Sequence, residues 1–185
     1  IDLGKNLARP VGAFNSAVGS LESRVLGCAR KFKDLGATPS AVELEVLDTP
    51  GHTMSHVCLL SRTDQPALFC GDTLFNAGAG NCHNGGQPAE LYRTFSEQLD
   101  RLPSSTLVYP GHDYIENNLR FTLARERDNT AAQALLPAVA GQDPALARVT
   151  TLAQEKEINT FLRLASPSVI AGLREAFPEL PERPD

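Results

Sequence analysis

The segment Leu47-Asp48-Thr49-Pro50-Gly51-His52-Thr53-Met54-Ser55-His56 decides the fold that this sequence predicts. Before it, apolar side chains alternate with glutamates over residues 42–46, which predicts a strand, and the apolar run at 57–60 predicts a second, buried strand. Pro50 restricts the preceding residue to an extended backbone, and Gly51 permits a sharp turn. The segment is therefore expected to be a loop that presents the imidazole of His52 at a strand end.

Two later segments repeat this arrangement. Phe69-Cys70 leads into Gly71-Asp72, and Leu107-Val108-Tyr109 leads into Pro110-Gly111-His112. If the three strand ends converge, His52, Asp72 and His112 offer two imidazoles and one carboxylate, which suit zinc, iron or manganese rather than calcium. Three ligands with open positions are typical of a catalytic metal site, whereas each residue taken alone would be read as an ordinary loop side chain.

The other two histidines have different surroundings. His56 begins the strand after the loop, and we expect it to support the site by hydrogen bonding rather than to bind metal. His83 lies in the glycine-rich stretch 76–86, which we expect to lack regular structure, and it either lines a pocket or faces solvent. The sequence contains no Gly-x-Ser-x-Gly element, so a serine nucleophile is disfavoured. It also lacks the glycine patterns of common phosphate-binding loops.

Composition limits the remaining possibilities. The chain has 185 residues, of which 42% are hydrophobic, enough for one domain or one and a half. A net charge of −5 without a basic patch argues against nucleic acid, and no apolar run approaches the roughly 18 residues that span a membrane. Four cysteines without a Cys-x-x-Cys pair indicate a reduced, cytoplasmic protein. Ile1 is not expected to be the biological start, and the oligomeric state is not indicated.

The chain divides into two parts by its texture. We predict an α/β domain over residues 1–114, in which 1–40 stay unassigned, and a helical domain over 115–185. Helices are expected at 20–35, 88–102, 116–126, 131–140 with a break or kink at Pro137, 152–164 and 168–177. No strand is expected after residue 114.

Several of these segments together resemble the metallo-β-lactamase superfamily, in particular the glyoxalase II, or hydroxyacylglutathione hydrolase, family. The resemblance covers roughly residues 42–165. It is carried by Thr49-Pro50-Gly51-His52-Thr53 with His56, by the segment from Gly71-Asp72-Thr73-Leu74-Phe75 to Gly80, by Gly111-His112-Asp113-Tyr114, by Thr151-Leu152-Ala153 with Glu155, and by Asn159-x-Phe161-Leu162-Arg163.

The resemblance implies an αββα sandwich, incomplete at its N-terminal side in this sequence, followed by a helical region. It implies two metal ions, zinc with iron or manganese as alternatives: His52 would bind the first, His112 the second, and Asp72 would bridge both. A metal-bound hydroxide would then attack the thioester of an S-acylglutathione such as S-lactoylglutathione, with Tyr114 lining the substrate pocket.

The sequence departs from the family in three places. The family's His-x-His-x-Asp-His motif is absent upstream of His52, so the remaining ligands are expected from residues outside this sequence. Asn81 stands where the family has a glutathione-contacting lysine, and His83 stands where it has a tyrosine. Two alternatives therefore stay open. One is a mono-iron enzyme like the persulfide dioxygenases, which the helical region disfavours, and the other is a metal-poor remnant without catalysis.

Overall fold

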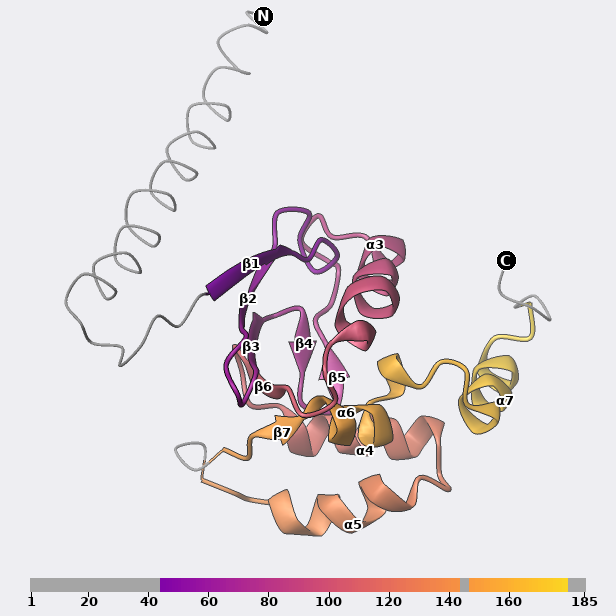
Figure 1. Ribbon diagram of the computed structural model, residues 1–185. Helices are drawn as coiled ribbons and strands as arrows, with labels where there is room; N and C mark the ends of the chain where they lie inside the picture. Colours follow the sequence, from indigo (N-terminus) through magenta and orange to yellow (C-terminus); the bar gives the residue numbers. More distant parts are fainter. Residues whose placement is uncertain (1–43, 144–146, 180–185) are drawn as a thin grey trace, which may run out of the picture. The chain divides into compact units, whose positions relative to one another are not determined.

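The computed structural model describes residues 44–143 and 147–179, and these are built on a five-stranded mixed sheet (Figure 1). Its strands, in spatial order, are β1 (Leu44–Asp48), β2 (Val57–Ser61), β3 (Ala67–Gly71), β6 (Leu107–Pro110) and β7 (Thr150–Thr151). β3 and β6 pair in parallel, and the other neighbouring strands pair antiparallel. Strands β1, β3 and β6 therefore run in the same direction and end at one edge of the sheet.

One face of the sheet carries the main core. Alternate residues of the three central strands are fully buried there: Cys58, Leu60, Leu68, Cys70 and Val108. They pack against a helical segment made of α3 (Pro88–Arg93), the π-helix η2 (Thr94–Gln98) and the 3-10 helix η3 (Leu99–Arg101). This segment corresponds to the helix predicted at 88–102, and its apolar stripe of Leu91, Phe95 and Leu99, spaced four residues apart, meets the sheet.

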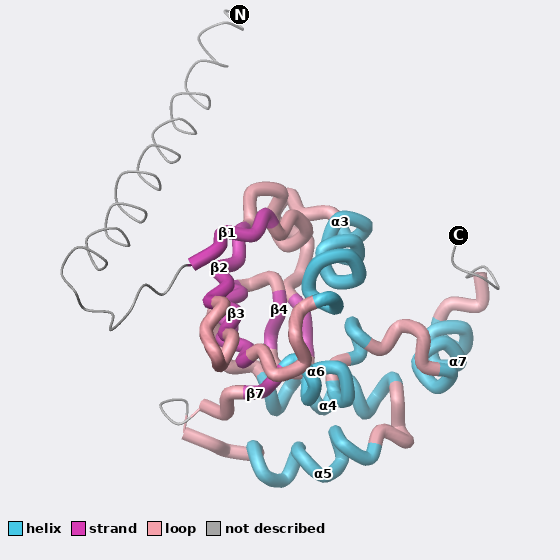
Figure 2. The backbone as a smooth tube through the Cα atoms, in the orientation of Figure 1, coloured by secondary structure: helices cyan, strands magenta, loops and turns pink. Residues whose placement is uncertain are grey.

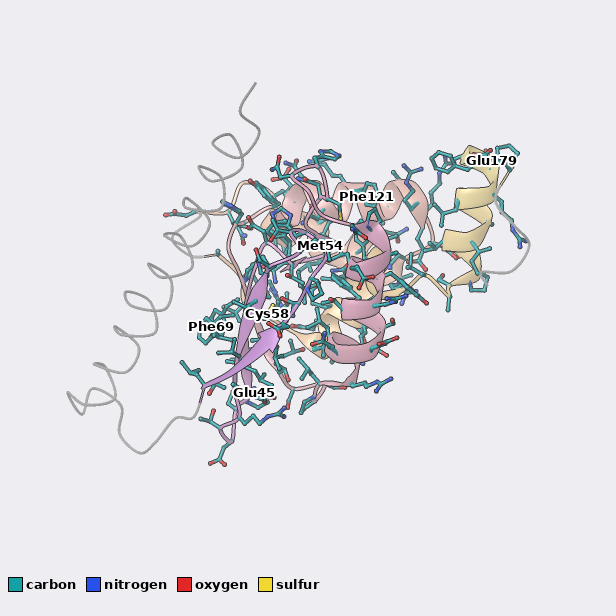
Figure 3. The ribbon with its side chains drawn as sticks, turned by 90° about the horizontal axis from the view of Figure 1, so that it is seen from above. Glu45, Met54, Cys58, Phe69, Phe121 and Glu179 are labelled. Carbon is teal, nitrogen blue, oxygen red and sulfur yellow. The ribbon has the colours of Figure 1, made fainter. Side chains whose placement is uncertain are left out.

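The opposite face of the sheet is apolar but open within the described residues. The strand register aligns Val46, Leu59, Phe69 and Tyr109 in one row across four strands. Val46 is 50% exposed and Phe69 46%, and the rings of Phe69 and Tyr109 stack with centroids 5.2 Å apart. Figure 3 shows Phe69 on the side of the sheet that faces away from α3.

Helices dominate the chain after residue 114, as Figure 2 shows. They are α4 (Ile115–Arg125), α5 (Thr130–Val139), α6 (Leu152–Ile158), the 3-10 helix η5 (Thr160–Leu162) and α7 (Pro167–Ala176). A second cluster of buried side chains joins α4, α5 and α6, and it includes Ile115, Leu119, Ala132 and Ile158. The cluster also includes Ala77, which is fully buried and lies in the turn between the short strands β4 (Leu74–Phe75) and β5 (Gly78–Ala79).

Most sequence predictions in the described range are confirmed. The α/β class with a C-terminal helical region is observed. The helix predicted to start at residue 88 does start there, with Pro88 in the first turn of α3. The helix predicted at 20–35 lies outside the described residues. The division into domains at residues 114 and 115 stays a prediction. Buried Cys58 and Cys70 are free thiols whose pKa values burial raises, and Cys82 is also free.

Three expectations were wrong. The single helix predicted over residues 152–164 is interrupted, because α6 ends at Ile158 and Asn159 is extended before η5 begins at Thr160. At Pro137, where a break or a kink was expected, α5 continues without a break. Part of the glycine-rich stretch is regular, since Gly78–Ala79 pairs with β4. A strand does follow residue 114, because Thr150–Thr151 pairs with β6. Strands of two residues are too short to produce a periodic signal.

No described helix is long and apolar enough to cross a membrane.

A buried ion pair ties the helices of the C-terminal region together. The carboxylate of Glu126, whose side chain is 3% exposed, accepts two hydrogen bonds from Arg163 at 2.8 and 2.7 Å. Ser166 and Asn129 donate to the same carboxylate at 2.6 and 2.8 Å. These bonds, those of Arg163 first, lower the pKa of Glu126 from an ordinary 4.5 to about 2.

This pair predicts how stability depends on pH. The Glu126 carboxylate stabilises the fold above pH 4.5, and this contribution is lost as the pH falls from 4.5 towards 2. We expect Glu126→Gln to cost about 3 kcal/mol at pH 7, because it leaves Arg163 without its charged partner. Urea unfolding between pH 2 and 7 measures both effects, and the variant should lose less stability over that range than the parent. Equal slopes for the two proteins would contradict the assignment.

Candidate functional site

The loop that carries His52 is held by the helical segment after the hairpin. Thr94 donates its hydroxyl hydrogen to the carbonyl of Pro50 at 2.7 Å. Gly51 has φ +149°, and a Cβ there would overlap the backbone of Leu91 in α3. Only glycine lets the loop pass this close to the helix, so the Pro50-Gly51 pair fixes the position of His52 in the loop after β1.

Asp72 and His112 are brought together by their backbones. The parallel strands β3 and β6 end side by side, and the N–H of Gly111 donates to the carbonyl of Gly71 at 2.8 Å. Gly71 adopts φ +47°, a left-handed conformation that favours glycine. A Cβ on Gly111 would lie 2.9 Å from Oδ1 of Asp72. The two Gly-x pairs therefore place the carboxylate next to the loop of His112.

Asp72 lies between the two imidazoles. Its Oδ2 is 3.7 Å from Nε2 of His52, and its Oδ1 is 3.4 Å from Nε2 of His112. Both separations are longer than a good N–H···O hydrogen bond. The Asp72 side chain is 34% exposed, as against 15% for His52 and 55% for His112. Each carboxylate oxygen thus faces a different imidazole at an accessible edge of the sheet.

The hydrogen bond on the far side of His52 sets its tautomer. Nδ1 of His52 lies 2.6 Å from the carbonyl oxygen of Asn81. A carbonyl can only accept, so Nδ1 carries the hydrogen and the lone pair of Nε2 is directed towards Asp72. A backbone carbonyl behind a histidine is a common way to orient a metal ligand.

His56 holds the backbone of Asp72. The N–H of Asp72 donates to Nε2 of His56 at 3.2 Å, so Nδ1 carries the hydrogen of the neutral ring. That nitrogen lies 2.8 Å from Oγ1 of Thr73 and 3.2 Å from Oγ1 of Thr49. Burial, with a smaller contribution from His52, lowers the pKa of His56, although Asp72 opposes the shift. These contacts require a neutral ring, which holds the backbone of Asp72 and the side chain of Thr73.

The distances between Asp72 and the two histidines suit bound cations, but the described residues supply only two donors for each cation. Two ligands about 2.1 Å from a tetrahedral zinc ion lie about 3.4 Å apart, close to both observed Asp72–imidazole separations. Among residues 44–143 and 147–179, however, no group of three or more His, Cys, Asp or Glu side chains is arranged to hold a metal ion. Each histidine pairs only with Asp72, so each position has two donors where zinc takes three or four from the protein.

Two of the three residues that the resemblance relates to the substrate, Tyr114 and Asn81, contact the site histidines. The exposed ring of Tyr114 stacks on His112 with centroids 5.4 Å apart and meets Phe75 edge-on. Asn81 and His83 are both exposed, and the side chain of Asn81 accepts the N–H of His83 at 3.0 Å. The structure thus brings Tyr114 and Asn81 to the site. His83 is linked to this loop by its backbone N–H, which donates to the side chain of Asn81.

Sequence patterns missed contributors of two kinds, first a pair of threonines and second a glycine. Thr49 and Thr73 meet the ring of His56, although Thr73 follows the Gly-Asp pair and so carried a positional signal. Gly80 is the second: its backbone packs so closely that a Cβ would collide with the carbonyl oxygen of Asp72 and lie 2.9 Å from Nδ1 of His52. The glycine-rich composition was the only signal for that contact.

Two families of known proteins match the chain. The family model of the metallo-β-lactamase superfamily matches residues 29–112, and that of the hydroxyacylglutathione hydrolase C-terminus matches residues 113–181. A hydroxyacylglutathione hydrolase of Polaromonas sp. strain JS666 is 69% identical over 164 residues, which are 88% of this chain and 62% of the relative. One of Nitrosococcus oceani is 66% identical over 146 residues, 79% of this chain and 56% of the relative.

The chain spans about three fifths of the length of these two curated relatives. Among solved structures, ETHE1 from Myxococcus xanthus is 27% identical, covers 77% of this chain and 49% of that chain, and has a TM-score of 0.47.

Gly80 provides a test of the tight packing at the site. We expect Gly80→Ala to cost about 3 kcal/mol or more, because the new methyl group has to displace the backbone of Asp72. Gly85→Ala is the control, since nothing lies within 4 Å of a Cβ there and only its positive φ is strained, at a cost of about 1 kcal/mol. Thermal and urea unfolding of the two variants measure the difference. Similar losses would show that the close approach at Gly80 is relieved cheaply.

Proposed function

The chain belongs to the metallo-β-lactamase superfamily and, within it, to the hydroxyacylglutathione hydrolases, and from this we propose that it serves metal-dependent hydrolysis of S-acylglutathione thioesters. The observation that carries the proposal is the position of Asp72, whose two carboxylate oxygens each face one imidazole. The match of residues 113–181 to the hydrolase C-terminus favours this activity over the dioxygenase alternative.

We assign two cations to the site, with zinc as the expected metal. His52 would hold one, His112 the other, and Asp72 would bridge them, and each cation would need further donors such as water. When bound, such cations lower the pKa of a water molecule and polarise the thioester carbonyl. No nucleophilic side chain is then required, which fits the missing serine element.

The chain's own residues provide orientation. The Asn81 carbonyl keeps the lone pair of His52 Nε2 directed at the site, and His56 fixes the backbone of Asp72 from behind. The stacked rings of His112 and Tyr114 form an exposed flank on the other side. We propose that the substrate's acyl and thiol portions lie along this flank and the loop of Asn81.

Asp72→Asn tests the proposal directly. The amide keeps the size of the side chain but removes the negative charge and one acceptor oxygen, so we expect loss of bound zinc and a fall of about 100-fold or more in kcat. Asp64→Asn, in an exposed turn, is the matched control. Zinc analysis and the loss of thioester absorbance of S-lactoylglutathione provide the readouts.

Two results would count against the proposal in different ways. If Asp72→Asn keeps both zinc and rate, Asp72 does not bridge. If the parent chain binds two zinc ions and still leaves S-lactoylglutathione intact, the assigned substrate is wrong.

The loop at Asn81 predicts a gain of affinity. Its backbone carbonyl serves His52 while its side chain is exposed, so Asn81→Lys adds a cation without removing the site contact. We expect the KM for a glutathione thioester to fall about two- to fivefold, as an exposed ion pair permits. Asn84→Lys adds the same charge three positions away and should leave KM unchanged. An equal effect of both variants would indicate general electrostatic attraction instead of a contact.

A further inference from the structure

The carboxylate of Glu155, on α6, is fully buried and accepts four hydrogen bonds. The N–H of Ala77 and the amide of Asn159 donate to Oε2 at 2.8 and 3.0 Å. The hydroxyl of Thr150 and the amide of Asn76 donate to Oε1 at 2.6 and 3.4 Å. Burial raises the pKa of this carboxyl and the hydrogen bonds oppose the shift. A fully buried carboxylate with donors from four different residues holds together the segments that carry them.

What Glu155 holds is the turn between β4 and β5. Ala77 has φ +55°, which a residue with a Cβ rarely adopts, and its buried N–H is directed at Glu155. Asn159, itself bound to Glu155, also donates to the carbonyls of Phe75 and Gly78 at 3.3 and 3.0 Å. The Glu155 carboxylate therefore holds the turn directly, and it orients the Asn159 amide that holds both strands of the hairpin.

The same hairpin connects two parts of the candidate site. Asp72 precedes β4 by two residues, and Gly80 and Asn81 follow β5 directly. The N–H of Gly80 donates to the carbonyl of Thr73 at 3.3 Å, which closes the hairpin at its base. Because Gly80 touches Asp72 and His52 without room for a Cβ, a shift of the hairpin moves the Asn81 carbonyl relative to the imidazole.

We propose that Glu155 is a positioning residue of the site, which by fixing the turn at Ala77 keeps the Asn81 carbonyl on Nδ1 of His52 and so maintains the tautomer that directs Nε2 at Asp72. This inference rests on the proposed function for the importance of His52, but the contact it concerns exists without metal or substrate. α6 thus sets the geometry of a loop far from it in sequence.

The test measures the His52 Nδ1–H directly. The full 185-residue chain is labelled with ¹⁵N-histidine, its four histidines are resolved by NMR, and His52→Gln identifies the relevant signal. The quantity measured is the rate at which the Nδ1 hydrogen exchanges with solvent, with and without chelator. Glu155→Gln keeps the shape of the side chain but turns one acceptor oxygen into a donor that faces other donors.

Glu126→Gln is the matched control, because Glu126 is also a buried carboxylate with three partner side chains but none of them belongs to the hairpin. Thr150→Val is a milder second variant that removes the 2.6 Å hydrogen bond and leaves the carboxylate, and it decides the question if Glu155→Gln does not fold. Far-UV circular dichroism and unfolding curves verify that each variant is folded and rank the variants by stability.

We expect exchange of the His52 hydrogen to become at least about tenfold faster in Glu155→Gln and Thr150→Val and to stay near the parent rate in Glu126→Gln. An unchanged rate in a folded Glu155→Gln, or equal acceleration in the control, overturns the proposal. Since no substrate is present, absence of thioester hydrolysis by the parent chain would refute the proposed function and leave this result intact.

Discussion

The site depends on the common direction of β1, β3 and β6. Antiparallel pairing of β1 with β2 and of β2 with β3, followed by parallel pairing of β3 with β6, makes the three strands end at one edge. The loops that follow these ends then bring His52, Asp72 and His112 to the same place. Open α/β sheets commonly bind ligands outside the carboxyl ends of their strands, because side chains from several loops meet there. A reversed β6 would send His112 to the opposite edge.

The sequence predicted this edge because each of the three predicted strands is followed by a glycine, which indicates a tight turn at the strand end. At Gly51, Gly71 and Gly111 the backbone lies so close to neighbouring atoms that a Cβ would obstruct it. The Gly-His and Gly-Asp pairs therefore indicated both the turn and the side chain that the turn presents. The amphipathic stripe of 88–102 predicted the covering helix for the same reason of regular spacing. What spacing could not reveal was the order of the strands or the 3.4 and 3.7 Å separations, which arise only when distant segments pair.

Patterns failed where single tertiary contacts decide the structure. The strand predicted at residues 42–46 is observed from Leu44 onward, where the described part begins, but Val46 lies on the open face and the described core is on the other face. A sheet that is apolar on both faces is typical of one that is covered on both. Glu155 occupies a helix where a charged residue is expected to face solvent, yet it is fully buried. Only the donors supplied by the hairpin explain that burial, and no local pattern contains them.

The two carboxylates near the hairpin, Glu155 and Asp72, have different roles: one stabilises the fold and the other is available to a ligand. Glu155 has four donors within 3.4 Å and is closed to solvent, so its lone pairs are used and it can accept no ligand. Asp72 is 34% exposed and faces two imidazoles at distances beyond good hydrogen bonds, so its lone pairs are available. Charge that is satisfied within the fold stabilises the fold, whereas charge left accessible between fixed nitrogens attracts a cation. The hairpin between them carries the rigidity of the first carboxylate to the position of the second.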